Sequence, residues 1–152
     1  MSVIPTSEHK TLKLTNVLSR RVRPEEMGSI PVVLTQMQNF IKSHGAQPIG
    51  PLIHHVGVTS GANPEPLIEL MIQANQLIPR LDPGYHMDAV LRVRSCLYAH
   101  YTGPMDKSQF AAQKLTIYAF ENDIPLNDSV YTIFVSQDPD EAVVDVFMET
   151  KA

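Results

Sequence analysis

Residues 100–126, HYTGPMDKSQFAAQKLTIYAFENDIPL, run from the end of a strand through a Gly-Pro turn into a helix, and residues 143–150, VVDVFMET, read as a later strand. The helix begins near Ser108, and apolar side chains such as Leu115 and Tyr118 recur in it at helical spacing. The alternation of apolar and polar residues in the later strand is typical of a sheet with one buried face.

The first half of the chain has the same order of elements. We predict two units of strand, helix, strand and strand, separated by the turn-rich residues 79–85. In the first unit we predict a strand over 12–22, a helix from Ser29, and strands over 52–59 and 67–78, the last with a bulge or an end near Ala74 and Asn75. In the second unit we predict a strand over 86–101, a helix from Ser108, and strands over 128–135 and 142–150.

The two units align in register. A shift of 78 residues places Val33 on Ala111, and a shift of 76 residues places Glu69 on Asp145. Internal similarity of this kind indicates a duplicated β-α-β-β unit. We therefore predict an α+β fold, an antiparallel sheet with both helices packed on one face.

The domain organisation follows from length and pattern. A chain of 152 residues is expected to form one domain. We predict an N-terminal arm over 1–11, then a single domain over 12–152 built of repeats 12–78 and 85–150. Duplicated halves often share a ligand cleft, so we expect one here.

Composition narrows the functional classes. Hydrophobic residues are 43% and charged residues 18% of the chain, as in ordinary globular proteins, and the net charge is −4. This charge argues against a nucleic-acid partner, which would favour a basic face. Cys96, the single cysteine, is expected to be a buried structural thiol.

The sequence offers no membrane or targeting signal. No apolar run approaches the roughly 18 residues of a membrane span, and the N-terminus does not read as a signal peptide. We expect a cytoplasmic protein with no membrane partner.

An acid interrupts the last strand. Alternation places Val143, Asp145 and Phe147 on one face, opposite the face that suits a helix-packed core. The matching strand of the first unit presents Glu69 and Met71 in the same way.

Three interpretations of these acids stay open. They are solvent-facing residues on an open sheet, or counter-charges in an apolar pocket, or acid–base groups. Tyr131 is expected on the strand beside that of Asp145, where its ring or hydroxyl would line the same cleft. Aromatic walls around a carboxylate suit a lipophilic cation.

The histidines do not form a metal motif. His54 and His55 are adjacent on a strand and point to opposite faces, so they cannot bind one ion from the same side. His86 and His100 have no ligand partner at a recognisable spacing. We expect structural or solvated histidines, no metal and no cofactor.

Three segments together resemble a known family. RSCLYAHYTGPM (94–105), VYTIF (130–134) and VVDVFMET (143–150) are similar to the GyrI-like small-molecule-binding domains, which include effector domains of multidrug-responsive regulators and stand-alone gyrase-inhibitory proteins. The likeness covers about residues 12–150, and the chain reads as a divergent member.

The resemblance implies roles for particular residues. The pocket glutamate that pairs with cationic ligands in the family falls on Asp145, which is one methylene shorter, and the family's aromatic residue falls on Tyr131. The Gly-Pro turn matches Gly103 and Pro104, but Met105 stands where an aromatic residue is usual. The proline usual near the end of the last strand is Glu149, and the chain has no tryptophan.

These observations predict a stand-alone, non-catalytic binding domain for a small apolar ligand, either neutral or cationic, which signals through a partner protein. The expected ligand-binding residues are Asp145, Glu69, Tyr131, Phe147, Val143 and Met71. The first alternative is a protein-binding, inhibitory or accessory module that uses the open sheet face, or a homodimer that buries it. The second is a small-molecule hydrolase.

Overall fold

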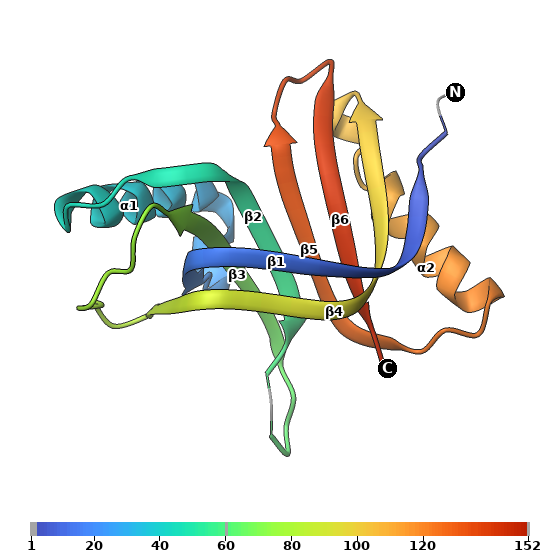
Figure 1. Cartoon of the computed structure of the whole chain (residues 1–152), viewed down its shortest axis with the longest axis horizontal. Coiled ribbons are helices and arrows are strands. Elements are labelled where there is room, and N and C mark those ends of the chain that lie inside the picture. The colour runs from blue at the N-terminus through green and yellow to red at the C-terminus, as the bar shows by residue number, and fades with distance from the viewer. Residues whose placement is uncertain (1–2, 60, 152) are drawn as a thin grey trace. The chain divides into compact units, whose positions relative to one another are not determined.

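The computed structural model describes residues 3–59 and 61–151. The predicted arm and domain are therefore described without Met1, Ser2, Ser60 and Ala152, which lie outside these ranges. Two helices and six strands follow one another in the predicted order (Figure 1). In chain order the elements are β1 (Thr6–Arg21), the 3-10 helix η1 (Pro24–Ser29), α1 (Ile30–Ser43), β2 (Pro48–Val58), β3 (Pro66–Ala74), β4 (Tyr85–Gly103), the 3-10 helix η2 (Met105–Lys107), α2 (Phe110–Glu121), β5 (Leu126–Ser136) and β6 (Ala142–Thr150).

The chain divides into two compact units. One is Lys13–Leu91, and the other is formed by the residues before Lys13 and after Leu91. We call them the first and the second unit. The long strands β1 and β4 each contribute to both units. The pairs β1–β3, β2–β3, β4–β6 and β5–β6 are antiparallel, and together with the two helices they confirm the predicted α+β class.

In the first unit, β3 lies between β1 and β2. Alternation along β3 sends Leu70 and Ile72 to the face that α1 covers, where both are buried. From α1, Met37 and Ile41 complete this core with no exposed surface. Apolar side chains spaced two residues apart on β3 therefore pack against apolar side chains spaced about four residues apart on α1, and together they form one layer.

In the second unit, β6 lies between β4 and β5. Val144, Val146 and Met148 point to the face covered by α2 and pack against Leu97 of β4 and Leu115 of α2. Figure 1 shows α2 behind this sheet. In each unit, one helix covers one face of the strands.

The first helix ends as the sequence predicts. Gly45 has φ +78°, in the left-handed region that favours glycine. Its N–H donates to the carbonyl of Lys42 at 3.1 Å, and the N–H of Ala46 donates to that of Ile41 at 3.2 Å. The helix begins at Ile30 with Pro31 in its first turn, where the missing N–H costs nothing.

The first strand is longer than predicted. It begins at Thr6 rather than at residue 12, so part of the predicted arm belongs to a strand. The N–H of His100 donates to the carbonyl of Pro5 at 3.0 Å, which ties this segment to β4. Residues 6–11 are mostly polar and carry no strand pattern, so pairing with another strand sets their conformation. The strand predicted over 67–78, with a bulge or an end near Ala74 and Asn75, ends at Ala74.

Cys96 is buried, as predicted. Burial raises the pKa of its thiol to about 11, and the nearby charge of Glu149 adds to this shift. A thiol with so high a pKa is almost wholly protonated near neutral pH, and it is therefore a poor nucleophile.

The two faces of α2 provide a matched test of the core. Leu115 is fully buried, whereas Ile117 on the same helix is 58% exposed. We expect Leu115→Ala to lower the free energy of unfolding by about 2–5 kcal/mol, because it leaves a cavity. Ile117→Ala should change it by only about 0.5 kcal/mol. Urea denaturation checks both, and equal losses would contradict the assigned core.

Candidate functional site

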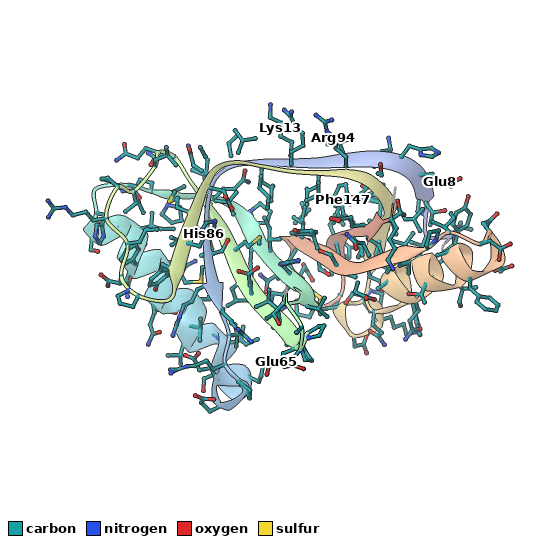
Figure 2. The ribbon with its side chains drawn as sticks, turned by 90° about the horizontal axis from the view of Figure 1, so that it is seen from below. Glu8, Lys13, Glu65, His86, Arg94 and Phe147 are labelled. Atoms are coloured by element: carbon teal, nitrogen blue, oxygen red, sulfur yellow. The ribbon has the colours of Figure 1, made fainter. Side chains whose placement is uncertain are left out.

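The face of the second unit's sheet that α2 does not cover carries an acid at its centre. We call it the helix-free face. Asp145 lies in the middle strand, β6, between His100 of β4 and Ile133 of β5. Because β6 alternates, Val143 and Phe147 lie on the same face as Asp145, as predicted. Figure 2 shows Phe147 on the side of β6 away from α2.

Two polar side chains of β4 converge on Asp145. The phenol of Tyr98 donates to Oδ1 at 2.7 Å, and Nδ1 of His100 lies 2.6 Å from the same oxygen. An ionised carboxylate can only accept, so Nδ1 of His100 carries the proton in this arrangement. The Tyr98 oxygen is also 3.4 Å from Nδ1 of His100. These three side chains, the Tyr98–Asp145–His100 cluster, form one connected network.

The cluster is open to solvent on one side. The side chain of Asp145 is 21% exposed and that of His100 is 38% exposed. Both hydrogen bonds end on Oδ1, and within residues 3–59 and 61–151 no donor reaches Oδ2. One oxygen of the acid thus remains for a further partner.

The pKa of Tyr98 is raised well above its ordinary value of 10.0. Burial contributes most, because it disfavours the charged phenolate. The hydrogen bond to Asp145 and the negative charge of that carboxylate add to the effect. Tyr98 is consequently a neutral donor to Asp145 throughout the physiological range.

Aromatic side chains surround the acid. The ring of Phe147 lies 4.9 Å from that of Tyr98, tilted by 41°. Tyr131 of β5 stands opposite Phe147 in the register and is buried, at 6% exposed. The predicted group of Asp145, Tyr131, Phe147 and Val143 is therefore brought onto one face.

The first unit holds a second acid on its own helix-free face. Oε1 of Glu69 lies 2.8 Å from Nδ1 of His55, and these side chains are 20% and 12% exposed. Met71 is on the same face, two residues along β3, and is buried. The strand register sets Arg21 of β1 and His55 of β2 on either side of Glu69.

Each predicted acid is thus bonded to a histidine of the neighbouring strand, a feature that sequence reasoning missed. The sequence predicts structural or solvated roles for His55 and His100, and it does not identify Tyr98, whose hydroxyl donates to Asp145. The available signal was alternation along β4, which puts Tyr98 and His100 on one face. Without the register of β4 against β6, that signal does not identify the acid opposite them.

The predicted divergence of His54 and His55 is confirmed. His54 pairs in register with Leu70, which belongs to the core, and burial lowers the pKa of its imidazole. His55 points to the opposite face, with Glu69. In the part of the chain that the structure describes, no three His, Cys, Asp or Glu side chains gather as a metal site would require.

No described helix is both long enough and apolar enough to span a bilayer. This statement covers α1 and α2, which have 14 and 12 residues.

Solved structures share this fold. The crystal structure of the EcmrR C-terminal domain superposes with a TM-score of 0.66 at 14% identity, covering 98% of this chain and 97% of that one. EcmrR in a DNA complex, seen by cryo-EM, gives 0.71 at 15% identity and 97% of this chain. This chain spans 57% of the length of that protein.

Two further solved structures share the fold at lower TM-scores. A hydrolase from Listeria innocua, encoded by lin2189, gives a TM-score of 0.56 at 9% identity, covering 97% of this chain and 91% of that one. SAV2435, solved bound to tetraphenylphosphonium, gives 0.55 at 8% identity, with coverage of 99% and 95%. No protein-family model and no curated protein matches the sequence. At the level of fold, the likeness to the EcmrR C-terminal domain confirms the predicted resemblance to GyrI-like domains.

The link between Tyr98 and Asp145 can be tested by titration. Asp145→Asn keeps the shape but removes the charge that opposes the phenolate, so the pKa of Tyr98 should fall toward 10.0 without reaching it, because burial remains. The carbon-13 chemical shift of each tyrosine Cζ, followed by NMR as the pH rises, reports the ionisation of that phenol. The signal that is absent in Tyr98→Phe identifies Tyr98.

Asp140→Asn is the control, since Asp140 is an exposed acid in the turn before β6. A raised native pKa favours the protonated phenol. The stability it contributes is therefore complete below pH 10 and is lost as the pH rises further, through the native pKa of Tyr98. If Asp145→Asn left the titration unchanged, the hydrogen bond would not exist in solution.

Proposed function

We propose that this chain is a binding domain for a small, largely apolar cation, which it holds on the helix-free face with Asp145 as the counter-charge. The observation that carries the proposal is the free Oδ2 of Asp145, an acid oxygen set among aromatic side chains and open to a partner.

The physical argument rests on the surroundings of the acid. A charge removed from water is costly unless it is paired, and a cation at Oδ2 would supply that pair. The faces of the Tyr98 and Phe147 rings would add attraction for a positive charge. Burial of ligand hydrocarbon would supply most of the affinity, while the acid selects the sign of the charge.

The protonation state of His100 decides whether Asp145 can bind a cation. If protonated, His100 already provides a cation beside Asp145, and a ligand cation would then meet a balanced pair. Cation capture therefore uses the neutral imidazole, which donates its Nδ1 proton and leaves the carboxylate charge uncompensated. We infer that Glu69, with His55 as its partner and Met71 beside it, plays the same part in the first unit.

The comparisons support this class of ligand. SAV2435 has the same fold and was solved with tetraphenylphosphonium, a lipophilic cation. EcmrR carries such a domain in a protein that binds DNA. We propose by analogy that the ligand state of this chain is passed to a partner.

One observation favours a second candidate, a hydrolase. Tyr98, Asp145 and His100 lie within hydrogen-bonding distance of one another, as acid and base groups must, and the Listeria innocua protein of this fold is described as a hydrolase. The predicted protein-binding face has less support. Met71 is buried, and Leu67 and Phe147 are not among the exposed large apolar side chains of the described chain.

Titration calorimetry with tetraphenylphosphonium tests the proposal. We expect the wild type to bind it and Asp145→Asn to bind it at least about ten-fold more weakly, because a charge pair is lost. Asp140→Asn should bind like the wild type. Equal affinity in all three proteins would remove Asp145 from the site.

The charge of the ligand provides a further check. Tetraphenylmethane derivatives without a charge should lose the Asp145 dependence while still binding through apolar contact. A hydrolase, in contrast, would turn over an ester or epoxide panel and lose that turnover in Asp145→Asn. Binding that is equally strong for lipophilic anions would contradict charge selection.

A further inference from the structure

The helix α2 carries large apolar side chains on its outer side as well as on its inner side. Its inner side packs Ala111, Leu115 and Ala119 into the core. Its outer side leaves Phe110, Ile117 and Phe120 at 46%, 58% and 84% exposed. Because a helix that only covers a sheet is normally polar outside, this outer side calls for a function.

The first unit supplies an internal comparison. The shift of 78 residues places Ile117 on Asn39 and Phe120 on Lys42 of α1. The outer side of α1 thus carries an amide and an ammonium group at two of these positions, whereas at the third Phe110 corresponds to the exposed Val32. Both helices cover a sheet, so Ile117 and Phe120 are not required by the shared scaffold.

A cavity of about 590 Å³ lies along this side of α2, within the second unit. The size falls in the roughly 300–1,000 Å³ range typical of small-molecule sites. Its walls are chiefly apolar and aromatic, and two lysines also line it. We call it the α2 groove, and its principal lining residues are Ile4, Tyr101, Phe110, Ile117, Lys107 and Lys114.

The N-terminal wall of the groove is held in place. Nζ of Lys114 donates to the carbonyl of Ile4 at 2.5 Å. The phenol of Tyr118 donates to Oε2 of Glu8 at 2.7 Å. With the bond from His100 to Pro5, three contacts fix this segment beside α2 and β4.

The Gly-Pro turn forms another wall. The phenol of Tyr101 donates to the carbonyl of Pro104 at 2.6 Å, folding the ring under the turn. Gly103 has φ +144°, and a Cβ there would lie 2.9 Å from the Tyr101 oxygen. Only glycine therefore permits this close approach, which gives the Gly103-Pro104 motif a role outside the helix-free face.

Charge in the groove is unevenly distributed. Lys107 lies just before the start of α2 and Lys114 one turn into it, whereas Glu121 is its last residue. At about 1.5 Å per residue, roughly 16 Å of helix separates Phe110 from Glu121. The helix dipole adds positive potential at the end near Lys107. An anion would therefore be placed at this end, away from Glu121.

We propose that the α2 groove binds a small amphipathic anion, an aromatic or fatty carboxylate or sulfonate. Its apolar body lies against Phe110 and Ile117, and its head group lies between Lys107 and Lys114. This site is separate from the cation site proposed on the helix-free face, and it takes a ligand of opposite charge.

Fluorescence titration with anilinonaphthalene sulfonate, an aromatic anion, tests this site. We expect saturable binding of one dye per chain. Ile117→Asn should weaken it about ten-fold or more, because the apolar wall is lost, and so should Lys107→Gln, because the head group loses a charge partner. Lys42→Gln on α1 is the matched control and should have no effect. Both altered groove residues are at the surface, so circular dichroism should show native folding.

The neutral analogue phenylnaphthylamine separates charge from apolar contact. Its binding should fall in Ile117→Asn and stay unchanged in Lys107→Gln. Several results would overturn the inference: no binding of the anion, equal binding by all variants, or loss of anion binding in Asp145→Asn, which would place the dye on the helix-free face. Asp145→Asn is expected to leave anion binding in the groove unchanged. The groove proposal and the cation-site proposal can therefore fail independently of each other.

Discussion

The two-residue period of the strands is the constraint on which the rest of the structure depends. In β6, this period sends Val144, Val146 and Met148 to the α2 layer and Asp145 to the other face. A slip of one residue would expose the apolar set and place the acid in the core without a partner. The burial energy of the core thus fixes the position of the acid, although the acid contributes nothing to that core.

A second regularity concerns electrostatics. In each unit the acid of the helix-free face is bonded to an imidazole from a neighbouring strand, through Nδ1 in both cases. The histidine lies within hydrogen-bonding distance of one oxygen of the carboxylate. This arrangement fits the proposed binding of an exchangeable cation, since a permanent arginine pair would occupy the acid.

The two units show how one scaffold carries different surfaces. Both pack a helix on antiparallel strands through the same kind of apolar layer. Outside that layer nothing in the packing restrains the residues, and there α1 and α2 differ: Asn39 and Lys42 correspond to Ile117 and Phe120. The core explains why the fold is shared, and the unrestrained positions are where the units acquire separate roles.

The sequence by itself determined the α+β class, the start of α1 at Ile30, its end before Gly45, and the face on which Asp145 lies. These features are local, since periodicity and capping act within a few residues. Only the tertiary structure brought His100 to Asp145, because 45 residues separate them and the register of β4 against β6 decides the meeting. The early start of β1 and the α2 groove were likewise decided by long-range contacts. A polar segment gains strand geometry from its partner, and a groove exists only once its walls, Ile4 and Ile117, are placed together.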